Sequence, residues 1–390
     1  MPVEFSGGIY VNPTTETNGL GQRGVDRAFF RRYVHQLEES GFDYTLVPYG
    51  SAGLDPFTLA AAVTQHSERL TAIVAVRANT LYPTTAARQL ATIDQLGGGR
   101  VAAHFIAGGN DHEQAREGDR LTKAQRYERE AEYIGLLRRI WSTRTPFDHA
   151  GRFYSFEDFV SDVVPVHGTI PISVGGSSPE AYRVAGALAD IVGLWGEPLA
   201  DTQDQIARVR REAAAAGRDR GPRPWLVIRP IIAPTDELAW EKAERILGAL
   251  RANSGRTALR VPSGAGGAQP GNVGSQRLLA LAARGARHDR ALWTATVSAG
   301  GGATTSLVGS PETVAAALLD YVDIGVEIFQ LRGYDYLADI IDFGEQLIPL
   351  VRQELARRHH HETPAHLPAA TPNPRNLQSR PLSTITKEHA

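Results

Sequence analysis

Short apolar runs and helical apolar periodicities alternate along the first 355 residues of the chain. Each run is rich in β-branched and aromatic residues, and apolar residues then recur every three or four positions, which is typical of a buried strand followed by an amphipathic helix. Phe29, Tyr33 and Leu37, for example, share one face of a predicted helix that ends at Gly41. Most units span about thirty residues, the length of a βαβ unit, which favours parallel pairing. Eight strands are predicted, at residues 5–11, 42–48, 70–77, 101–107, 170–175, 190–195, 225–232 and 326–332.

Eight strand–helix units predict a (β/α)8 TIM barrel with its active site at the carboxyl ends of the strands. We expect a single domain over residues 1–356. Residues 108–123 are polar and charged and indicate an insertion, and the glycine-rich residues 300–307 indicate backbone freedom before the last unit. From about 253 to 290 the composition shifts to Gly, Ala, Ser and Arg, which predicts an insertion that is either a mobile lid or disordered. Residues 357–390 are expected to form an extended C-terminal tail that reaches a neighbouring subunit.

A literal Gly-x-Gly-x-x-Gly from Gly19 to Gly24 offers an alternative fold, a doubly wound dinucleotide-binding sheet, with Asp43 about twenty residues further on. That motif needs its first glycine directly at the exit of a strand. Here residues 12–18 intervene and include a proline, and Asp43 falls at the start of the second strand instead of its end. The barrel is therefore preferred.

Composition and charge exclude several kinds of chemistry and of partner. The chain has no cysteine, which removes disulfides, thiolate metal ligands and cysteine nucleophiles together. A formal net charge of -2, from 41 basic and 43 acidic residues, gives no reason to expect a nucleic acid or a membrane surface as partner. The N-terminus has no basic stretch followed by an apolar core, and no apolar run is long enough to span a membrane. We expect a cytoplasmic protein with a small-molecule partner.

Neither a metal site nor a protein nucleophile is indicated. No histidine or carboxylate spacing matches a metal site, and the run His359–His361 lies in the expected tail, where exposure to solvent is the simpler interpretation. A Gly-x-Ser-x-Gly nucleophile motif is also missing. The chemistry is therefore expected to come from a bound cofactor.

The turn after the fifth strand is the first candidate site. Gly175 and Gly176 end a β-branched run, and Ser177, Ser178 and a proline then read as the start of a capped helix. Two interpretations are open: an ordinary capped turn, or a phosphate site in which the glycines admit the anion and the free amides and hydroxyls bind it. Alone, the pattern favours the capped turn because it is shorter than known phosphate motifs. Its place at the exit of a barrel strand favours the phosphate site.

Polar side chains near the last two strands form the second candidate site. Arg229 lies on the seventh strand, Gln330 and Arg332 share one side of the eighth, and Tyr334 follows just past its end. An arginine in a barrel mouth needs an anion or a carboxylate partner, so each one either belongs to a structural ion pair or binds an anionic substrate. Two arginines together favour the anionic substrate.

Three more residues lie towards the exits of other strands: Arg77 on the third, His104 on the fourth and Trp195 on the sixth. A lone histidine on a strand, such as His104, is more often a satisfied core residue than a general base. Their shared edge of the barrel nevertheless makes them candidates for the same site.

Seven segments appear in a recognisable order between residues 5 and 355. Together they resemble the bacterial luciferase-like flavin monooxygenases, and within that family the FMNH2-dependent alkanesulfonate monooxygenases; the tail lies outside the resemblance. The segments are Tyr82–Asp94, Arg126–Glu128, Val174–Ser178, Leu194–Pro198, Ser306–Gly309, Gly333–Tyr334 and Phe343–Glu345.

The resemblance implies an enzyme that uses O2 and reduced FMN, supplied by a separate NAD(P)H-dependent flavin reductase, to convert an organosulfonate into sulfite and an aldehyde. It also implies a homo-oligomer, either a dimer or a tetramer. The site residues that follow from it fall into three groups: Gly176, Ser177, Ser178 and Tyr127 at the FMN phosphate, with His104 and Arg77 also in the cofactor site; Trp195, Arg229 and Tyr334 as catalytic residues; and Arg332, Arg229 and Gln330 as substrate ligands.

The chain departs from the resemblance at positions that bear on the substrate. Thr15 and Ile231 stand where the alkanesulfonate enzymes have histidines, Gly53 stands where they have a cysteine, and their lid arginine aligns near Gly300. Arg332 replaces a small residue and is expected to act as the second anion clamp, with Arg229 as the first. We therefore predict a bulkier or hydroxylated sulfonate, such as the sulfosugar sulfoquinovose.

Three other functions stay open at this point. The first is an FMNH2-dependent monooxygenase that acts on a sulfone or a chelator, and the second is a deazaflavin-dependent oxidoreductase on the same barrel. The third is a flavin-binding barrel without turnover, which the missing histidines and cysteine would fit and which Arg229 and Tyr334 argue against.

Overall fold

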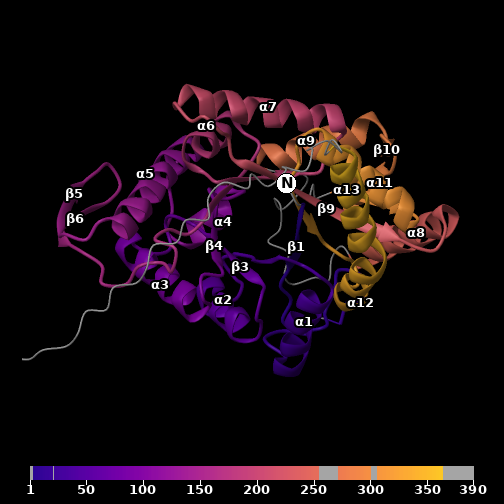
Figure 1. Cartoon of the computed structure of the whole chain (residues 1–390), viewed down its shortest axis with the longest axis horizontal. Coiled ribbons are helices and arrows are strands. Elements are labelled where there is room, and N and C mark those ends of the chain that lie inside the picture. Colours follow the sequence, from indigo (N-terminus) through magenta and orange to yellow (C-terminus); the bar gives the residue numbers. More distant parts are fainter. Residues whose placement is uncertain (1–2, 21, 254–270, 300–304, 363–390) are drawn as a thin grey trace, which may run out of the picture.

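A closed barrel of eight parallel strands forms the centre of the computed structural model, which describes residues 3–20, 22–253, 271–299 and 305–362 (Figure 1). Each strand pairs with the next along the chain, and the last one pairs with both the first and the seventh, which closes the ring. Each of the eight strands overlaps the range predicted for it from the sequence, so the TIM barrel is confirmed. They are β1 (Glu4–Gly8), β2 (Tyr44–Val47), β3 (Thr71–Val76), β4 (Val101–Ile106), β7 (Ile172–Gly175), β8 (Ile191–Trp195), β9 (Arg223–Ile232) and β13 (Ile328–Leu331).

Helices surround the barrel as an outer ring (Figure 1). Several begin at a side chain that accepts a hydrogen bond from a backbone N–H group of the first turn, as Asp26, Thr122 and Ser310 do. The ring consists of α1 (Arg27–Glu39), α2 (Pro56–Gln65), α3 (Pro83–Leu96), α5 (Lys123–Ser142), α6 (Pro179–Leu188), α7 (Leu199–Ala215), α8 (Asp236–Asn253), α11 (Pro311–Asp323), α12 (Tyr336–Asp342) and α13 (Ile348–Glu362), with the π-helical turn Phe343–Leu347 between the last two.

Apolar side chains fill the barrel interior near the amino ends of the strands. Trp225 packs there with four smaller residues, Ile73, Ala102, Ile191 and Ile328, and with the partly buried Tyr44 and Leu46. This layer closes one end of the barrel, so a ligand can enter only from the carboxyl ends of the strands, where the candidate residues lie.

The segments outside the repeat contain more regular structure than the sequence predicted. The insertion at 108–123 includes the short helix α4 (Asp111–Arg116), and a hairpin, β5 (Phe147–Ala150) and β6 (Ser155–Phe159), follows α5. The expected lid or disordered insertion contains a regular helix, α9 (Val273–Arg284), and the start of the expected tail belongs to α13. Residues 254–270 and 363–390 lie outside the described residues, so the lid and the extended tail stay predictions.

A strand that the sequence analysis missed, β12 (Ser306–Gly309), pairs with the carboxyl half of β9. β13 and β8 pair with the earlier part of β9, so β9 has three neighbours among the described strands. β12 continues through β11 (Leu292–Trp293) to β10 (Arg287–His288), with α10 (Ala295–Ala299) between β11 and β12. The strand was not predicted for two reasons. Its four residues are all buried and therefore show no alternation of apolar and polar positions, and the glycines before it indicate irregular backbone. Residues 300–304 lie outside the description.

The doubly wound alternative is wrong. Asp43 accepts a hydrogen bond from the N–H group of Phe5 at 2.8 Å and pairs with Arg352 at 3.1 Å, so it joins β1 to α13 instead of binding a ribose.

In the described part of the chain no helix is both long and apolar enough to cross a membrane.

Candidate active site

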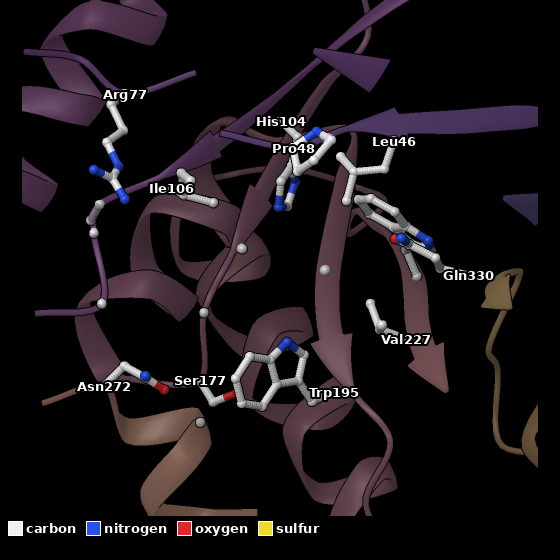
Figure 2. Close-up of a pocket in the computed structure, with 18 of the residues that line it drawn as sticks. Leu46, Pro48, Arg77, His104, Ile106, Ser177, Trp195, Val227, Asn272 and Gln330 are labelled. Carbon is white, nitrogen blue, oxygen red and sulfur yellow. The ribbon is translucent and has the colours of Figure 1, made fainter. Parts of the chain in front are cut away.

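A cavity of about 410 Å³ opens at the carboxyl ends of the barrel strands (Figure 2). Its volume lies within the range of small-molecule sites. Nine of the eleven residues that the sequence analysis proposed line it, and Figure 2 shows His104, Ser177 and Trp195 around the same space. The two that do not line it are Arg229 and Tyr334. The nine are Arg77, His104, Tyr127, Gly176, Ser177, Ser178, Trp195, Gln330 and Arg332.

The turn between β7 and α6 forms one wall of this cavity. Ser178 caps α6, because its Oγ accepts a hydrogen bond from the N–H group of Ala181 at 3.3 Å, and both Ser177 and Ser178 are buried. Gly176 has a φ of +140°, and a Cβ placed there would lie 2.7 Å from the Tyr127 hydroxyl and 2.9 Å from the Cβ of Ala181. Only glycine fits this position, and it leaves a polar cradle at the start of a helix, where an anion is stabilised.

Helix α5 adds two side chains to the cradle. Burial raises the pKa of Tyr127 above its ordinary value, so its hydroxyl stays protonated and can donate a hydrogen bond. Lys123, one helical turn earlier, also lines the cavity, and burial lowers its pKa although it is only half-buried. The sequence analysis missed Lys123. Its spacing of four residues from Tyr127, which puts both on one face of a helix, is the signal that could have found it.

The N-terminus of α9 is a second feature that the sequence analysis missed. Asn272 caps this helix by accepting a hydrogen bond from the N–H group of Ser275 at 2.6 Å, and Asn272, Val273 and Gly274 line the cavity. A Cβ at Gly274 would meet the Trp195 ring at 3.6 Å, so the helix passes close over that indole. The cap Asn272 followed by Ser275 was a local signal, but the surrounding Gly- and Ala-rich composition obscured it.

His104 lies in the cavity floor as a neutral side chain. Its Nδ1 lies 2.9 Å from Ser173 Oγ, and its ring packs edge-on against Trp225 with the ring centres 5.0 Å apart. Burial lowers its pKa from 6.5 to about 4, so it carries no charge at neutral pH. Gly175 gives the ring room, because a Cβ there would lie 2.8 Å from His104 Cε1. His104 can therefore offer a hydrogen bond, without a charge, to a ligand.

Arg77 reaches the cavity with its charge already balanced. Its guanidinium forms ion pairs with Glu113 at 2.9 Å and Glu117 at 3.2 Å, and it stacks over the ring of Tyr49. Both carboxylates come from α4 and the residue after it. Arg77 thus anchors the insertion to the barrel and presents no unpaired charge to a ligand.

Two buried polar atoms near the cavity floor have no hydrogen-bond partner among the described residues. They are Oε1 of Gln330 and Nε1 of Trp225, and both residues line the cavity. Unpaired polar atoms in a protein interior are costly, and a bound ligand or ordered water commonly satisfies them. The floor therefore fits a ligand that has polar edges as well as a flat apolar face.

Arg229 and Arg332 meet at one carboxylate. Arg229 is 3% exposed, donates from Nη1 to Glu16 at 3.0 Å and from Nη2 to the carbonyl of Gly333 at 2.8 Å, and lies 3.5 Å from the centre of the Tyr334 ring. Arg332 lines the cavity, and its Nη2 is 3.6 Å from the other oxygen of Glu16, too far for a hydrogen bond. Arg229 thus forms an ion pair of the structural kind that the sequence left open, and binding of an anion by the two arginines together stays a prediction.

The hydroxyl and the backbone N–H group of Tyr334 also have partners within the protein. Its hydroxyl and the Ser306 hydroxyl are 3.0 Å apart, and its backbone N–H donates to Asp339 at 2.6 Å. Ser306 belongs to β12, the strand that the sequence analysis missed. Catalytic roles for Arg229 and Tyr334 stay predictions.

Among the described residues no group of three or more histidines and carboxylates could hold a metal ion.

Residues 8–327 match the family model described as luciferase-like monooxygenase. This match covers most of the chain, and the chain belongs to the luciferase-like monooxygenase family.

Solved structures with the same fold include enzymes of more than one kind. A riboflavin lyase, solved with modified FMN and riboflavin, has a TM-score of 0.73 at 19% identity, over 91% of this chain and 92% of that one. The EDTA monooxygenase from Chelativorans sp. BNC1 has a TM-score of 0.71 at 17% identity, over 91% and 94%. An F420-dependent secondary alcohol dehydrogenase has a TM-score of 0.64 at 16% identity, over 90% and 99%. At these identities the likeness shows the fold alone.

Proposed function

We propose that the protein is the oxygenase of a two-component system, which uses O2 and FMNH2 from a separate NAD(P)H-dependent flavin reductase to release sulfite and an aldehyde from an organosulfonate. One observation carries the proposal: a single cavity joins a phosphate cradle on β7 to the guanidinium of Arg332 just past β13. The barrel order places β8 and β9 between these strands on one side and β1 to β4 on the other, so they lie across the barrel from each other.

The residues at the cradle fit the phosphate of FMN. The free amides of the β7–α6 turn and the hydroxyls of Ser177, Ser178 and Tyr127 would bind the phosphate oxygens, with the Lys123 ammonium as the nearby cation. The missing Cβ of Gly176 leaves the space that the oxygens need. Reduced FMN supplies the electrons that activate O2.

The cavity floor fits a flavin ring. His104, Gln330 and Trp225 offer polar atoms to its edge, and Leu46, Pro48 and Ile106 offer apolar contact to its faces (Figure 2). The neutral state of His104 suits this role, because a buried cation beside the ring would need a counter-charge that the floor does not supply among the described residues.

Two residues have proposed roles at the reacting end. The Trp195 ring borders the cavity beside α9 and would shield the reacting atoms from water. Arg332 would bind the sulfonate group, since its N–H donors make no hydrogen bond to a side chain among the described residues and it is 29% exposed, towards the cavity. Arg229 and Tyr334 would then act behind Arg332, through Glu16, instead of touching the substrate. A bulky or hydroxylated sulfonate, such as a sulfosugar, is the substrate we propose.

The remaining parts of the proposal follow from the family resemblance. We propose a cytoplasmic homo-oligomer, a dimer or a tetramer, whose one further protein partner is the flavin reductase. Mass measurement in solution, for the full chain and for a chain cut after residue 362, tests the assembly and the role of the tail.

Sulfite release tests the function. The protein is incubated with FMN, a flavin reductase, a nicotinamide donor, O2 and a panel that contains simple alkanesulfonates and sulfosugars, and sulfite is measured with and without O2. We expect sulfite only with O2, and more from the hydroxylated members. If no sulfonate releases sulfite, the proposed substrate class is wrong. Oxidation of a secondary alcohol to a ketone with oxidised deazaflavin as the hydride acceptor would instead favour the hydride-transfer enzymes that share the fold.

A further inference from the structure

The unpaired polar atoms of Gln330 and Trp225 indicate which part of a ligand lies at the cavity floor. Gln330 is 2% exposed and Trp225 is 1% exposed, yet Gln330 Oε1 and Trp225 Nε1 have no hydrogen-bond partner among the described residues. An indole N–H group can only donate a hydrogen bond, and an amide oxygen can only accept one. The floor therefore holds one donor and one acceptor that the described part of the chain leaves unsatisfied.

The two side chains belong to adjacent strands and face the same way. Trp225 on β9 pairs in register with Ile328 on β13, and Gln330 is the next residue of β13 on the same side. Trp225 and Ile328 pack together inside the barrel, so Gln330 also faces the interior, nearer the cavity mouth. The ring of His104 packs edge-on against the indole and holds it in place. The donor and the acceptor can therefore act on one edge of a ligand.

We propose that Gln330 and Trp225 recognise the imide edge of the flavin, in which the N3–H group stands between two carbonyls. Gln330 Oε1 accepts the hydrogen bond from N3–H, and Trp225 Nε1 donates to a carbonyl beside it. The inference rests on the proposed function, which makes FMN the cofactor. It adds the orientation of the ring: the pyrimidine end lies at the floor, and the dimethylbenzene end points away from Gln330 and Trp225.

Gln330 can adapt to this edge at little cost. Rotation about the last bond of its side chain turns Oε1 towards a ligand, and no hydrogen bond of Oε1 to the described residues is broken by that turn. Leu46 and Val227, drawn beside Gln330 in Figure 2, have apolar side chains that cannot replace a missing partner. A ligand edge without an N–H group would leave Gln330 unpaired, and buried polar groups of this kind discriminate strongly between ligands.

The floor and the phosphate cradle lie at opposite sides of the cavity. Figure 2 shows Gln330 and Leu46 on one side and Ser177 and Asn272 on the other, and their strands β13 and β7 face each other across the barrel. A flavin with its phosphate in the cradle can reach the floor with its ring. A ring turned end for end would present methyl groups to Gln330 and Trp225, which can neither donate nor accept a hydrogen bond.

Binding of oxidised FMN analogues tests the inference without turnover. FMN is compared by fluorescence titration with 3-methyl-FMN, in which a methyl group replaces the N3 hydrogen, and with 8-demethyl-FMN, which is altered at the other end of the ring. We expect the wild-type protein to bind 3-methyl-FMN about thirtyfold more weakly than FMN, because the methyl group leaves Gln330 unpaired. The affinity for 8-demethyl-FMN should stay within about threefold of the affinity for FMN, since that end makes no hydrogen bond at the floor.

The variant Gln330→Met separates the hydrogen bond from the space that the methyl group needs, because methionine is close to glutamine in size and has no amide. We expect the Kd for FMN to rise about tenfold in this variant, and the preference for FMN over 3-methyl-FMN to fall from about thirtyfold to about threefold. Gln36→Met is the control: Gln36 bonds to Ser40 at the end of the outer helix α1, and its loss should leave both values unchanged.

Two results would overturn the inference. A retained thirtyfold preference in Gln330→Met would show that space alone excludes the methyl group. Equal affinities of the wild-type protein for FMN and 3-methyl-FMN would show that the imide edge is not recognised, and this comparison needs no variant to fold. A protein that discriminates as expected but releases no sulfite from any sulfonate would contradict only the proposed substrate class.

Discussion

The two ends of the cavity are built in different ways. The proposed phosphate end is mainly local: Gly176, Ser177 and Ser178 belong to one turn, and Ser178 both lines the cavity and caps α6. Helix α5 adds Tyr127 and Lys123 to it. The substrate end is assembled over long range, since Glu16 follows β1 and its hydrogen-bonded partner Arg229 lies 213 positions away on β9. A change at the phosphate end should therefore affect one ligand group, whereas a change at the substrate end should also affect the stability of the fold.

Comparison of Arg229→Ala with Arg332→Ala gives the largest expected difference. Loss of Arg229 removes a buried ion pair, a hydrogen bond to Gly333 and the stacking on Tyr334, so we expect the free energy of unfolding to fall by roughly 3 kcal/mol. Among the described residues the side chain of Arg332 has one ion pair, the 3.6 Å contact with Glu16, so its loss should lower that free energy by less than about 1 kcal/mol. Urea unfolding measures both values.

In substrate binding, the variant Arg332→Ala should show the larger effect. Arg332→Ala is expected to raise the KM for a sulfonate about a hundredfold, the worth of a charge-assisted hydrogen-bond pair, while the Kd for FMN changes less than threefold. Equal losses of stability in the two variants would mean that Arg229 is not the structural member of the pair. An unchanged KM in Arg332→Ala would remove Arg332 from the substrate site.

Gly176→Val should act on the phosphate end alone. Its side chain would fill the cradle, where even a Cβ lies 2.7 Å from the Tyr127 hydroxyl, so we expect the Kd for FMN to rise a hundredfold or more. Fluorescence titration with FMN measures this change. Gly168→Ala is the control for backbone strain, because Gly168 also has a positive φ, +76°, but no atom lies within 4 Å of its Cβ position. A similar loss of affinity in both variants would show that strain, and not the cradle, is responsible.

The local and long-range construction also explains what the sequence could predict. The barrel strands and the β7–α6 turn follow from periodicity and capping signals that lie within a few residues of each other. The pairing of Arg229 with Glu16 was recognised only as one of two possibilities, because nothing near either residue in the sequence identifies the partner. Strand β12 was missed for the same reason, since its place is set by the carboxyl half of β9 and not by its own four residues.

Two cavity residues at helix starts lie between the features that local signals predict and those that depend on distant partners. Lys123 and Asn272 both carry local signals, the first its helical spacing from Tyr127 and the second its capping of α9. Each was overlooked because the surrounding composition indicated a loop or an insertion. Composition averages over a segment, while a cavity is lined by the few side chains that the fold turns inward.

His104 provides the smallest effect and extends the comparison to the cavity floor. Its pKa is lowered by burial to about 4 in the folded protein, from 6.5, so between these values the unfolded chain binds a proton that the folded chain does not. The stability is therefore complete above pH 6.5 and declines as the pH falls towards 4. His104→Asn removes this proton, and we expect the loss of unfolding free energy between pH 7.5 and pH 4.5 to shrink by about 1 kcal/mol, less than the full linkage value because the ring borders the open cavity. Urea unfolding at the two pH values measures it, with the exposed His35→Asn as the matched variant. If His104→Asn and the wild-type protein lose the same free energy on acidification, the floor histidine is solvated and already charged, and the floor would then offer a ligand a cation instead of a neutral donor.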